Sequence, residues 1–412
     1  MSTTIQADTP QATPAAPNVA VRKPPAADRR FARYLALDDF EAAARRHLPR
    51  MLYGFISGGA ETNAARQANL DSYQDYAFVP RILADVSRRS HGKMLFGREY
   101  TAPFGIAPMG ASAICAYRGD LVFAQAAAAA NVPMILSAAS LIRLEEIRAA
   151  GPTAWYQAYL PGDAARIEPL VDRVAAAGYE VFVLTVDVPV SANRENNVRS
   201  GFSIPIKPSA KLAWDVVTHP RWSVGTFART IVQHGMPHFE NMDATRGPPV
   251  ISRNLERALG NRDQMSWEHV KLIRRRWKGR FVIKGVLSVA DARAAKDHGV
   301  DGIMVSNHGG RQLDGAVAPL RALPHIVEAA RGMTVMLDGG IRRGTDVLKA
   351  LALGADFVFA GRPFLYAAAV GGEAGVRHAV ELLSTEVGRD MALLGVSDLS
   401  EVRPELLTRA RA

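Results

Sequence analysis

The stretch FVIKGVLSVADARAAKDHGVDGIMVSNHGG, residues 281–310, decides the fold. It contains two short apolar runs, residues 281–287 and 302–308, on either side of an amphipathic segment. Ser288 stands where a helix cap is expected, and Gly299 stands where that helix should end. A strand, a helix and a second strand in this order indicate parallel strands joined by a crossover helix.

The same unit recurs along the chain from Pro103 onward. The candidate strands are residues 104–110, 134–139, 154–160, 181–187, 281–287, 302–308, 334–340 and 357–362. Asp163 and Thr345 are expected to cap two further helices, which end at Gly178 and Gly354. Eight strands, each followed by helical sequence, fit an α/β fold of the closed (β/α)8 TIM-barrel type better than an open doubly wound sheet.

One long interruption follows the fourth strand. This insertion, residues 188–265, is too long for a structureless loop in a compact domain, so it should form short helices or carry its own function. Trp214, Trp222 and Phe227 alternate there with basic residues. The pattern suits peripheral membrane association through residues 205–250. A lid or a contact between subunits fits it equally well.

The two ends of the chain lie outside the barrel pattern. Residues 1–32 are rich in Ala, Pro and Thr and predict a disordered arm. A cleaved transit peptide is less consistent with Asp8 and Asp28, because such peptides are poor in acidic residues. Residues 33–412 should then form a single domain. A helix from Asp38 or Asp39 through residue 56 is expected before the barrel, and further helices are expected over residues 372–412.

Composition narrows the classes of function. The lone cysteine, Cys115, excludes an internal disulfide and a multi-cysteine metal site, and no metal is predicted. The net charge of +10 suits acidic small molecules, anionic lipid or nucleic acid. The basic residues are scattered and no DNA-reading motif occurs, so no nucleic-acid partner is expected. We expect a cytoplasmic protein, peripheral on the cytoplasmic membrane face if the insertion binds lipid.

Polar residues close several apolar strands, at the barrel end where active sites form. They are Gln157 and Tyr159, Thr185 and Asp187, Lys284, and Ser306 with its neighbours. Such groups must be satisfied by one another or by a ligand. A flavin would satisfy them, with Lys284 facing the negative charge of the reduced isoalloxazine and Ser137, Gln157 and Thr185 hydrogen-bonding the ring.

Two glycine- and arginine-containing turns follow the last two strands. They are DGGIRRG, residues 338–344, and the pair Gly361 and Arg362. Glycines at this place let backbone N–H groups approach a phosphate, and a phosphate site is expected here in such barrels.

The segment SNHGGRQLD, residues 306–314, carries the most chemical information. His308 can abstract a proton while Arg311 holds a carboxylate with both arms of its guanidinium group. Asp187 could pair with His308 and raise its basicity. This combination predicts a catalytic base rather than a turn residue.

These segments, together with IAPMG (106–110), YQAY (156–159), LTVDVP (184–189), VIKGV (282–286) and DGGIRRGTDVLKALALGA (338–355), resemble one family in order and spacing. It is the FMN-dependent (S)-2-hydroxy acid oxidase/dehydrogenase family, which includes glycolate oxidase, flavin-type L-lactate dehydrogenase and (S)-mandelate dehydrogenase. The resemblance covers nearly the whole chain except the N-terminal arm. It implies FMN as cofactor and oxidation of a 2-hydroxy acid to the 2-oxo acid.

The resemblance also implies a role for individual residues. His308 would remove the substrate proton, Asp187 would support it, Tyr159 would bind the substrate hydroxyl, and Arg311 and Arg194 would bind the carboxylate. The isoalloxazine and ribityl parts of FMN would lie against Pro108, Met109, Gly110, Ser137, Gln157, Thr185, Lys284 and Ser306. The phosphate end would lie against Asp338, Gly340, Arg342, Gly361 and Arg362.

Two positions in the substrate pocket depart from the glycolate-oxidising members. Phe55 stands where the family commonly carries a carboxylate-binding tyrosine, and Ala139 stands where those members carry tryptophan. The small Ala139 favours an aryl or long-chain substrate. Gly110 and residues 219–237 look most like the mandelate dehydrogenase branch, which is membrane-associated and reduces a quinone. Relatives form tetramers, so a homo-oligomer is expected.

Three alternatives remain open. The first is an oxidase that uses dioxygen and releases hydrogen peroxide. The second is an FMN barrel acting on an amino or peptide-derived substrate, to which Phe55 would be an adaptation, although Arg194 and Arg311 would then lack a partner. The third is a non-catalytic flavin protein, which the retained His308, Asp187 and Tyr159 disfavour.

Overall fold

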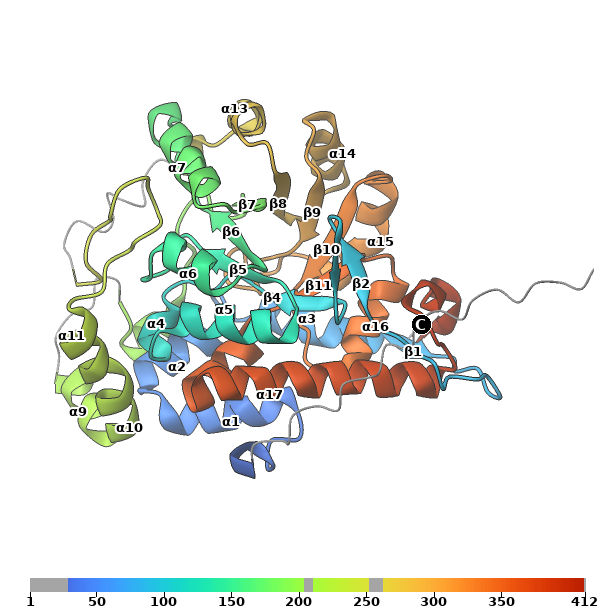
Figure 1. Cartoon of the computed structure of the whole chain (residues 1–412), viewed down its shortest axis with the longest axis horizontal. Coiled ribbons are helices and arrows are strands. Elements are labelled where there is room, and N and C mark those ends of the chain that lie inside the picture. Colours follow the sequence, from blue (N-terminus) through green and yellow to red (C-terminus); the bar gives the residue numbers. More distant parts are fainter. Residues whose placement is uncertain (1–28, 204–209, 252–261, 411–412) are drawn as a thin grey trace, which may run out of the picture.

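A closed barrel of eight parallel strands organises the chain (Figure 1). The computed structural model describes residues 29–203, 210–251 and 262–410. The barrel strands are β4 (Phe104–Ile106), β5 (Met134–Ser137), β6 (Ala154–Ala158), β7 (Val181–Thr185), β8 (Arg280–Val286), β9 (Gly302–Val305), β10 (Thr334–Asp338) and β11 (Phe357–Ala360), and β11 pairs with β4 to close the ring. The predicted (β/α)8 barrel is confirmed.

The strands are short, buried segments rich in β-branched and aromatic residues, as their sequences VFVLT (β7) and FVFA (β11) illustrate. The predicted strands extend beyond the observed carboxyl ends. β9, for example, ends at Val305, whereas the predicted run continues to His308. The polar residues there leave the ladder to form loops, which is why they are available to a ligand.

Helices surround the barrel. They are α4 (Ser112–Cys115), α5 (Gly119–Ala130), α6 (Leu144–Ala150), α7 (Ala164–Ala176), α13 (Trp267–Arg276), α14 (Val289–Asp297), α15 (Pro319–Ala329), α16 (Gly344–Ala352) and α17 (Arg362–Leu394). The predicted caps Asp163 and Ser288 each accept a backbone N–H. Thr345 is not a cap: α16 begins one residue earlier, and Asp346 accepts the N–H groups of Arg342 and Arg343, both at 2.9 Å.

The inside of the barrel is filled by large apolar side chains, among them Trp155, Met304, Met336 and Phe359. A hairpin of β2 (Lys93–Leu95) and β3 (Arg98–Tyr100) adds Tyr100 to this cluster, and Phe96 at its turn lies 5.7 Å from Trp155 between ring centroids. The barrel is therefore a packed core, and its ligand sites lie at the carboxyl ends of the strands.

An N-terminal segment covers part of the barrel. It contains η1 (Arg29–Phe31), α1 (Leu37–His47), α2 (Arg50–Ser57), α3 (Ala64–Asp71), η2 (Ser72–Asp75) and β1 (Tyr76–Phe78). The single helix expected through residue 56 is wrong. Pro49 lacks an N–H and disfavours a helical residue before it, so the chain breaks into α1 and α2. Of the expected arm, residues 1–32, the first 28 lie outside the described residues.

The C-terminal segment differs in detail from the expectation. Its main helix, α17, begins at Arg362 rather than Gly372, and Gly372 instead marks a kink within it. η5 (Leu399–Glu401) and η6 (Pro404–Leu406) follow, and the last described element is a strand, β12 (Leu407–Arg409), which pairs antiparallel with β1. The C-terminus of the described chain is thus joined to the N-terminal segment beside the barrel.

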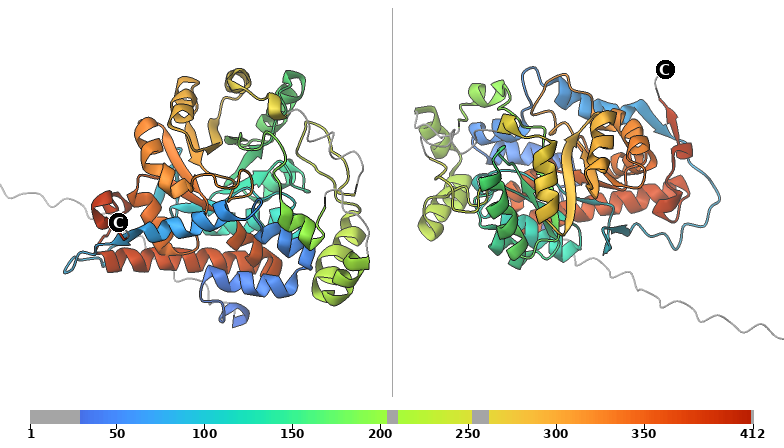
Figure 2. Two further views of the ribbon diagram at one scale, coloured as in Figure 1. Left: turned by 180° about the vertical axis from the view of Figure 1, so that it is seen from behind. Right: turned by 90° about the horizontal axis from the view of Figure 1, so that it is seen from above.

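The described elements of the insertion after β7 are α8 (Glu195–Ser200), α9 (Ala210–Thr218), α10 (Pro220–Trp222), the π-helical turn η3 (Ser223–Ala228), α11 (Arg229–His234) and, before α13, η4 (Arg262–Gln264). Of these, α9, α10 and α11 form a group at one end of the molecule (Figures 1 and 2). Trp222 is buried and donates its indole N–H to the Ile114 carbonyl, whereas Trp214 and Phe227 are exposed. No helix in the described ranges is long and apolar enough to cross a membrane.

Candidate active site

The centre of the site is a histidine–aspartate pair at the ends of two barrel strands that are separated by one strand, β8. His308 follows β9 and Asp187 follows β7, and both lie on the carboxyl side of the barrel. The Nδ1–H of His308 donates to Oδ1 of Asp187 at 2.9 Å. This bond leaves the Nε2 lone pair free, and the Tyr159 hydroxyl lies 3.4 Å from Nε2. The predicted cluster of His308, Asp187 and Tyr159 therefore forms.

Burial and neighbouring charges set the protonation state of this pair. Burial lowers the pKa of His308, and although Asp187 acts in the opposite sense, Lys284 and Arg194 lower it further, so the ring is neutral at pH 7. Asp187 thus makes the ring more basic, as expected, but burial outweighs this effect and the net pKa is lowered. Burial alone would raise the pKa of Asp187, but His308 and Lys284 hold it below its usual value.

The backbone at His308 is unusual. Its φ of +58° lies in the left-handed region, which non-glycine residues rarely adopt and which is common at functional sites. Ser306 Oγ stabilises this conformation by accepting the His308 N–H at 3.0 Å. Two residues later, a Cβ added to Gly310 would lie 2.3 Å from the Arg66 backbone nitrogen, so only glycine allows α3 to approach the loop.

Two arginines lie beside the pair without a carboxylate partner among the described residues. Arg194 donates to the Arg311 carbonyl at 3.1 Å and to Gln312 Oε1 at 2.7 Å. Arg311 donates to the carbonyls of Phe55 and Gly58 at 2.7 and 2.8 Å. Burial lowers the pKa of both guanidinium groups. Two buried cations bound only to neutral oxygens form a site for an anion.

Phe55 and Ala139, the two departures expected in the substrate pocket, lie beside Arg311 and Gly110, respectively. Phe55 stacks on Phe202 with ring centroids 4.3 Å apart, and the Arg311 guanidinium lies 5.0 Å from the Phe55 centroid. Ala139 follows β5 and is close to Gly110, since a Cβ on Gly110 would approach Ala139 Cβ to 2.9 Å. The small residues at both positions allow the loops after β4 and β5 to approach each other closely.

Lys284 is the buried cation of the expected flavin site, and it has a partner that the sequence did not indicate. Its Nζ lies 2.9 Å from Asp338 Oδ2 and donates to Ser306 Oγ at 2.9 Å. Burial by itself lowers the pKa of Lys284, but Asp338 and Asp187 outweigh it and raise the pKa. An ammonium group has three N–H donors. One therefore remains for a ligand.

Several buried polar atoms near this lysine have no protein partner in the described structure. They are both amide atoms of Gln157 and the hydroxyl of Thr185. Unpaired buried polar atoms are costly and rare in folded proteins. A flavin ring, whose edge carries hydrogen-bond donors and acceptors, would satisfy them. Ser137, the last residue of β5, is also buried at this end of the barrel. Its Oγ accepts the Ala139 N–H at 3.2 Å. The residues present therefore fit FMN.

The expected phosphate end lies after β10 and β11. Gly340 has a φ of +84°, and Gly361 directly precedes the N-terminus of α17, where the helix dipole favours an anion. Arg342 lies 3.3 Å from Asp38 Oδ1. The Arg362 side chain instead donates to the carbonyls of Ile56, Gly58 and Gly309 at 2.9 to 3.0 Å, and burial lowers its pKa to about 10. Pro108 and Met109 are half-buried in the loop after β4.

Sequence reasoning missed the contacts that come from the N-terminal segment. Asn69 and Asn307 exchange two hydrogen bonds of 2.7 Å, and the Tyr73 hydroxyl donates to the Gly339 carbonyl at 2.8 Å. Asp314 accepts the Ala65 N–H at 2.8 Å. Arg262 lies 4.7 Å from the centroid of the Tyr159 ring. These pairs are far apart in the sequence, and no motif connects them.

Comparison with known proteins agrees with this geometry. The model of the FMN-dependent dehydrogenase family matches residues 44–409. An L-lactate dehydrogenase from Caulobacter vibrioides is 40% identical over 90% of this chain and 96% of its own. An (S)-mandelate dehydrogenase from Pseudomonas putida is 36% identical over 90% and 93%.

A solved structure described as the monotopic membrane protein (S)-mandelate dehydrogenase superposes with a TM-score of 0.82 at 34% identity, and covers 92% of this chain and 100% of its own. The match extends over the barrel and over the active-site segments. The chain therefore belongs to the FMN-dependent dehydrogenase family: it is an oxidoreductase that uses FMN and acts on the CH–OH group of 2-hydroxy acids.

Proposed function

We propose that the protein oxidises a bulky, aryl-bearing (S)-2-hydroxy acid to the 2-oxo acid, with His308 as the catalytic base. The observation that carries the proposal is the orientation of the imidazole ring. Asp187 engages Nδ1 at 2.9 Å, which leaves Nε2 open beside the Tyr159 hydroxyl and near two arginines without a carboxylate partner. Base, hydroxyl donor and anion site are the groups this reaction needs.

The substrate carboxylate would lie between Arg194 and Arg311, which also fixes the orientation of C2. The Tyr159 hydroxyl would donate to the substrate oxygen. FMN, held by Lys284, Gln157 and Thr185, would supply the oxidant for the two electrons and one of the two hydrogens that the carbinol loses. His308 Nε2 takes the other hydrogen as a proton, and the Asp187 carboxylate stabilises the imidazolium that results.

The proposed aryl group rests on the shape of the pocket. Ala139 occupies little volume, and the stacked rings of Phe55 and Phe202 provide an aromatic wall beside Arg311. Aromatic rings pack well against such a wall. The similarity to proteins named (S)-mandelate dehydrogenase supports the same choice. The missing hydroxyl at position 55 removes one hydrogen bond that would help a small hydroxy acid.

We further propose a membrane quinone as the electron acceptor, with the insertion as the membrane contact. Trp214, Val217, Val224, Phe227 and Val232 expose between 42 and 83% of their surface. Exposed apolar side chains among basic ones suit the interface of a bilayer. The similarity to a protein described as monotopic in the membrane supports this contact. An oxidase that uses dioxygen is the alternative for the same active site.

The test is anaerobic reduction of the purified flavoprotein by (S)-mandelate, (S)-lactate and glycolate, followed by air and a peroxide assay. Fast bleaching by (S)-mandelate with slow reoxidation in air is the expected result, and His308→Ala should abolish bleaching while FMN stays bound. Fast reoxidation with a full yield of peroxide would instead identify an oxidase. If none of the three acids bleaches bound FMN, the hydroxy-acid substrate proposed here is wrong.

A further inference from the structure

A cavity of about 460 Å³ lies between the insertion and the barrel helices α5 and α17, away from the active site. Arg221 and Arg229 of the insertion line one side, and Tyr117 and Arg118 before α5 line another. His47, the last residue of α1, and Glu373 of α17 complete the polar lining. The cavity thus joins four separate segments of the chain and has an excess of basic groups.

The charges in this cavity are not balanced within the described structure. Arg118 pairs with Glu146, and Glu373 lies 3.8 Å from Arg377, so these two lining residues are compensated. None of the described carboxylates comes within 4.0 Å of Arg221 or Arg229. Burial lowers the pKa of His47, and the nearby Arg221 and His219 lower it further.

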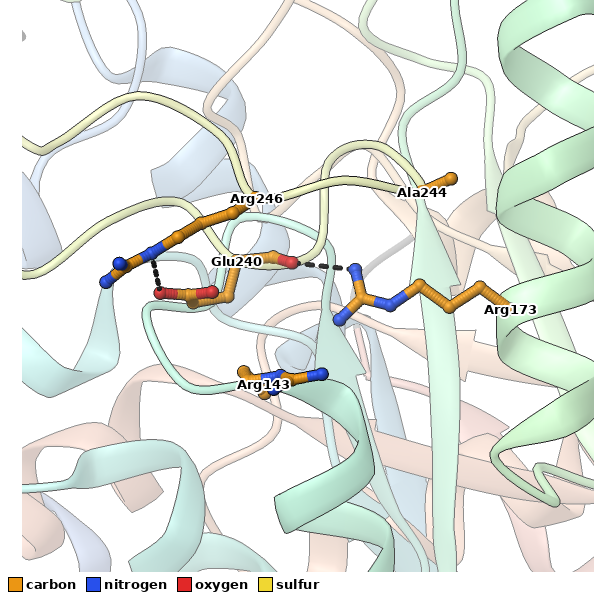
Figure 3. Close-up of a pocket in the computed structure, with 5 residues that line it drawn as sticks. All are labelled: Arg143, Arg173, Glu240, Ala244 and Arg246. Atoms are coloured by element: carbon orange, nitrogen blue, oxygen red, sulfur yellow. Dashed lines mark hydrogen bonds and ion pairs between the residues drawn. The ribbon is translucent and has the colours of Figure 1, made fainter.

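A neighbouring cavity of about 470 Å³ provides the contrast (Figure 3). It is also rich in arginine, but there the arginines have partners. Arg246 lies 2.8 Å from Glu240, Arg173 binds Glu145 and the Glu240 carbonyl at 2.8 Å, and Arg143 lies 3.4 Å from Glu145. Each arginine of that cavity thus has a carboxylate partner, with Glu145 shared by Arg173 and Arg143.

The walls of the first cavity are amphipathic. The Arg229 guanidinium lies over the Tyr117 ring at 3.9 Å, which fixes its position, and Leu121 and Ala368 supply apolar surface. Gly225 and Thr226 of η3 face the cavity, whereas Val224 and Phe227 beside them are 69 and 42% exposed. The opening is therefore adjacent to the apolar side chains that would enter a bilayer.

We propose that this cavity binds the phosphate of an anionic phospholipid, with Arg221 and Arg229 as the phosphate ligands and the glycerol part against Leu121 and Ala368. The proposal rests on the membrane contact proposed above and adds lipid selectivity to it. A free phosphate is also an anion, but it would leave the apolar walls uncovered. Two unpaired guanidinium groups beside an apolar face match a lipid headgroup that remains attached to the bilayer.

The experiment measures binding of the full-length, FMN-loaded protein to vesicles of phosphatidylcholine alone and of phosphatidylcholine mixed with phosphatidylglycerol. The double variant Arg221→Gln/Arg229→Gln should bind the anionic vesicles about 30-fold more weakly, the factor that corresponds to about 1 kcal/mol for each basic residue at the surface. Its binding to neutral vesicles and its bleaching by substrate should not change. Arg45→Gln/Arg46→Gln, two exposed arginines outside the cavity, is the matched control for charge.

Each outcome decides between explanations. Equal losses in the test and control variants would show a diffuse charge effect and refute the site. Binding of the wild-type protein to neither vesicle would refute the membrane contact itself. Native mass spectrometry then tests the cavity separately, because the wild-type protein should retain a phosphatidylglycerol that the double variant loses. Retention of inorganic phosphate but no lipid would reject the lipid and identify a soluble anion as the ligand.

Discussion

Replacing Asp187 by Asn tests how the catalytic base is tuned. An amide oxygen can still accept the Nδ1–H of His308, so the 2.9 Å hydrogen bond and the ring orientation are retained while the negative charge is lost. A hydrogen bond to a charged group contributes about 1.5–3 kcal/mol. If this contribution is lost in the transition state, where His308 becomes an imidazolium, kcat should fall about 10- to 150-fold.

The pH dependence gives a second, independent readout. His308 acts as a base only when it is neutral, so activity is lost as the pH falls through its pKa. Burial lowers that pKa and Asp187 opposes the effect of burial. Without the carboxylate, the pKa should fall further, and the acid limb of the kcat/KM profile should move to lower pH even though kcat on the plateau is smaller.

The assay is stopped-flow bleaching by (S)-mandelate across a pH series, with FMN content checked by absorbance. Asp172→Asn, an exposed carboxylate paired with Arg276, serves as the control and should change neither quantity. An acid limb that moves to higher pH, or a kcat within about twofold of wild type, would refute the assigned role of Asp187.

Three further substitutions test the cofactor and substrate sites. Gln157→Leu removes two buried amide atoms that lack protein partners, so the unfolding free energy of the FMN-free protein should rise by about 1–3 kcal/mol while the affinity for FMN falls. Thermal unfolding with and without FMN measures both effects. A destabilised FMN-free protein would contradict the proposed fit of Gln157 to FMN. Ala139→Trp should lower kcat/KM for (S)-mandelate about 100-fold relative to glycolate, and an unchanged ratio would remove Ala139 from the pocket. Phe55→Tyr restores a phenol near Arg311 and should lower KM for (S)-lactate by a factor between about 2 and 100, whereas a higher KM would show that stacking on Phe202 matters more.

The barrel and the centre of the site could be predicted from the sequence because both follow from repetition. Eight β/α units force the carboxyl ends of parallel strands to meet at one face, so polar residues after separate strands converge. This reasoning joins His308 to Asp187 although the two are far apart in the chain. The single helix expected through residue 56 was wrong, because proline excludes the continuous helix that the apolar periodicity suggested.

Other parts of the site depend on contacts for which the sequence holds no local signal. Nothing in the chain identifies Asn69 as the partner of Asn307, or Asp338 as the counterion of Lys284 rather than a residue of the phosphate end. The net direction of the His308 pKa depends on burial, which only the folded structure defines. The predicted strands extend past the observed carboxyl ends, because polar loop residues such as Asn307 directly follow an apolar run but form no backbone pairs with the neighbouring strand.

The contacts between the N-terminal segment and the strand-end loops matter to anyone who would engineer this protein. A shortened enzyme that started at β4 would keep every barrel strand and every residue of the SNHGGRQLD motif. It would nevertheless lose Asn69 and Tyr73, which support the loops after β9 and β10, and the α3 backbone against which Gly310 packs. The smallest functional unit is therefore the barrel together with the helices that precede it, and circular permutation would have to preserve that junction.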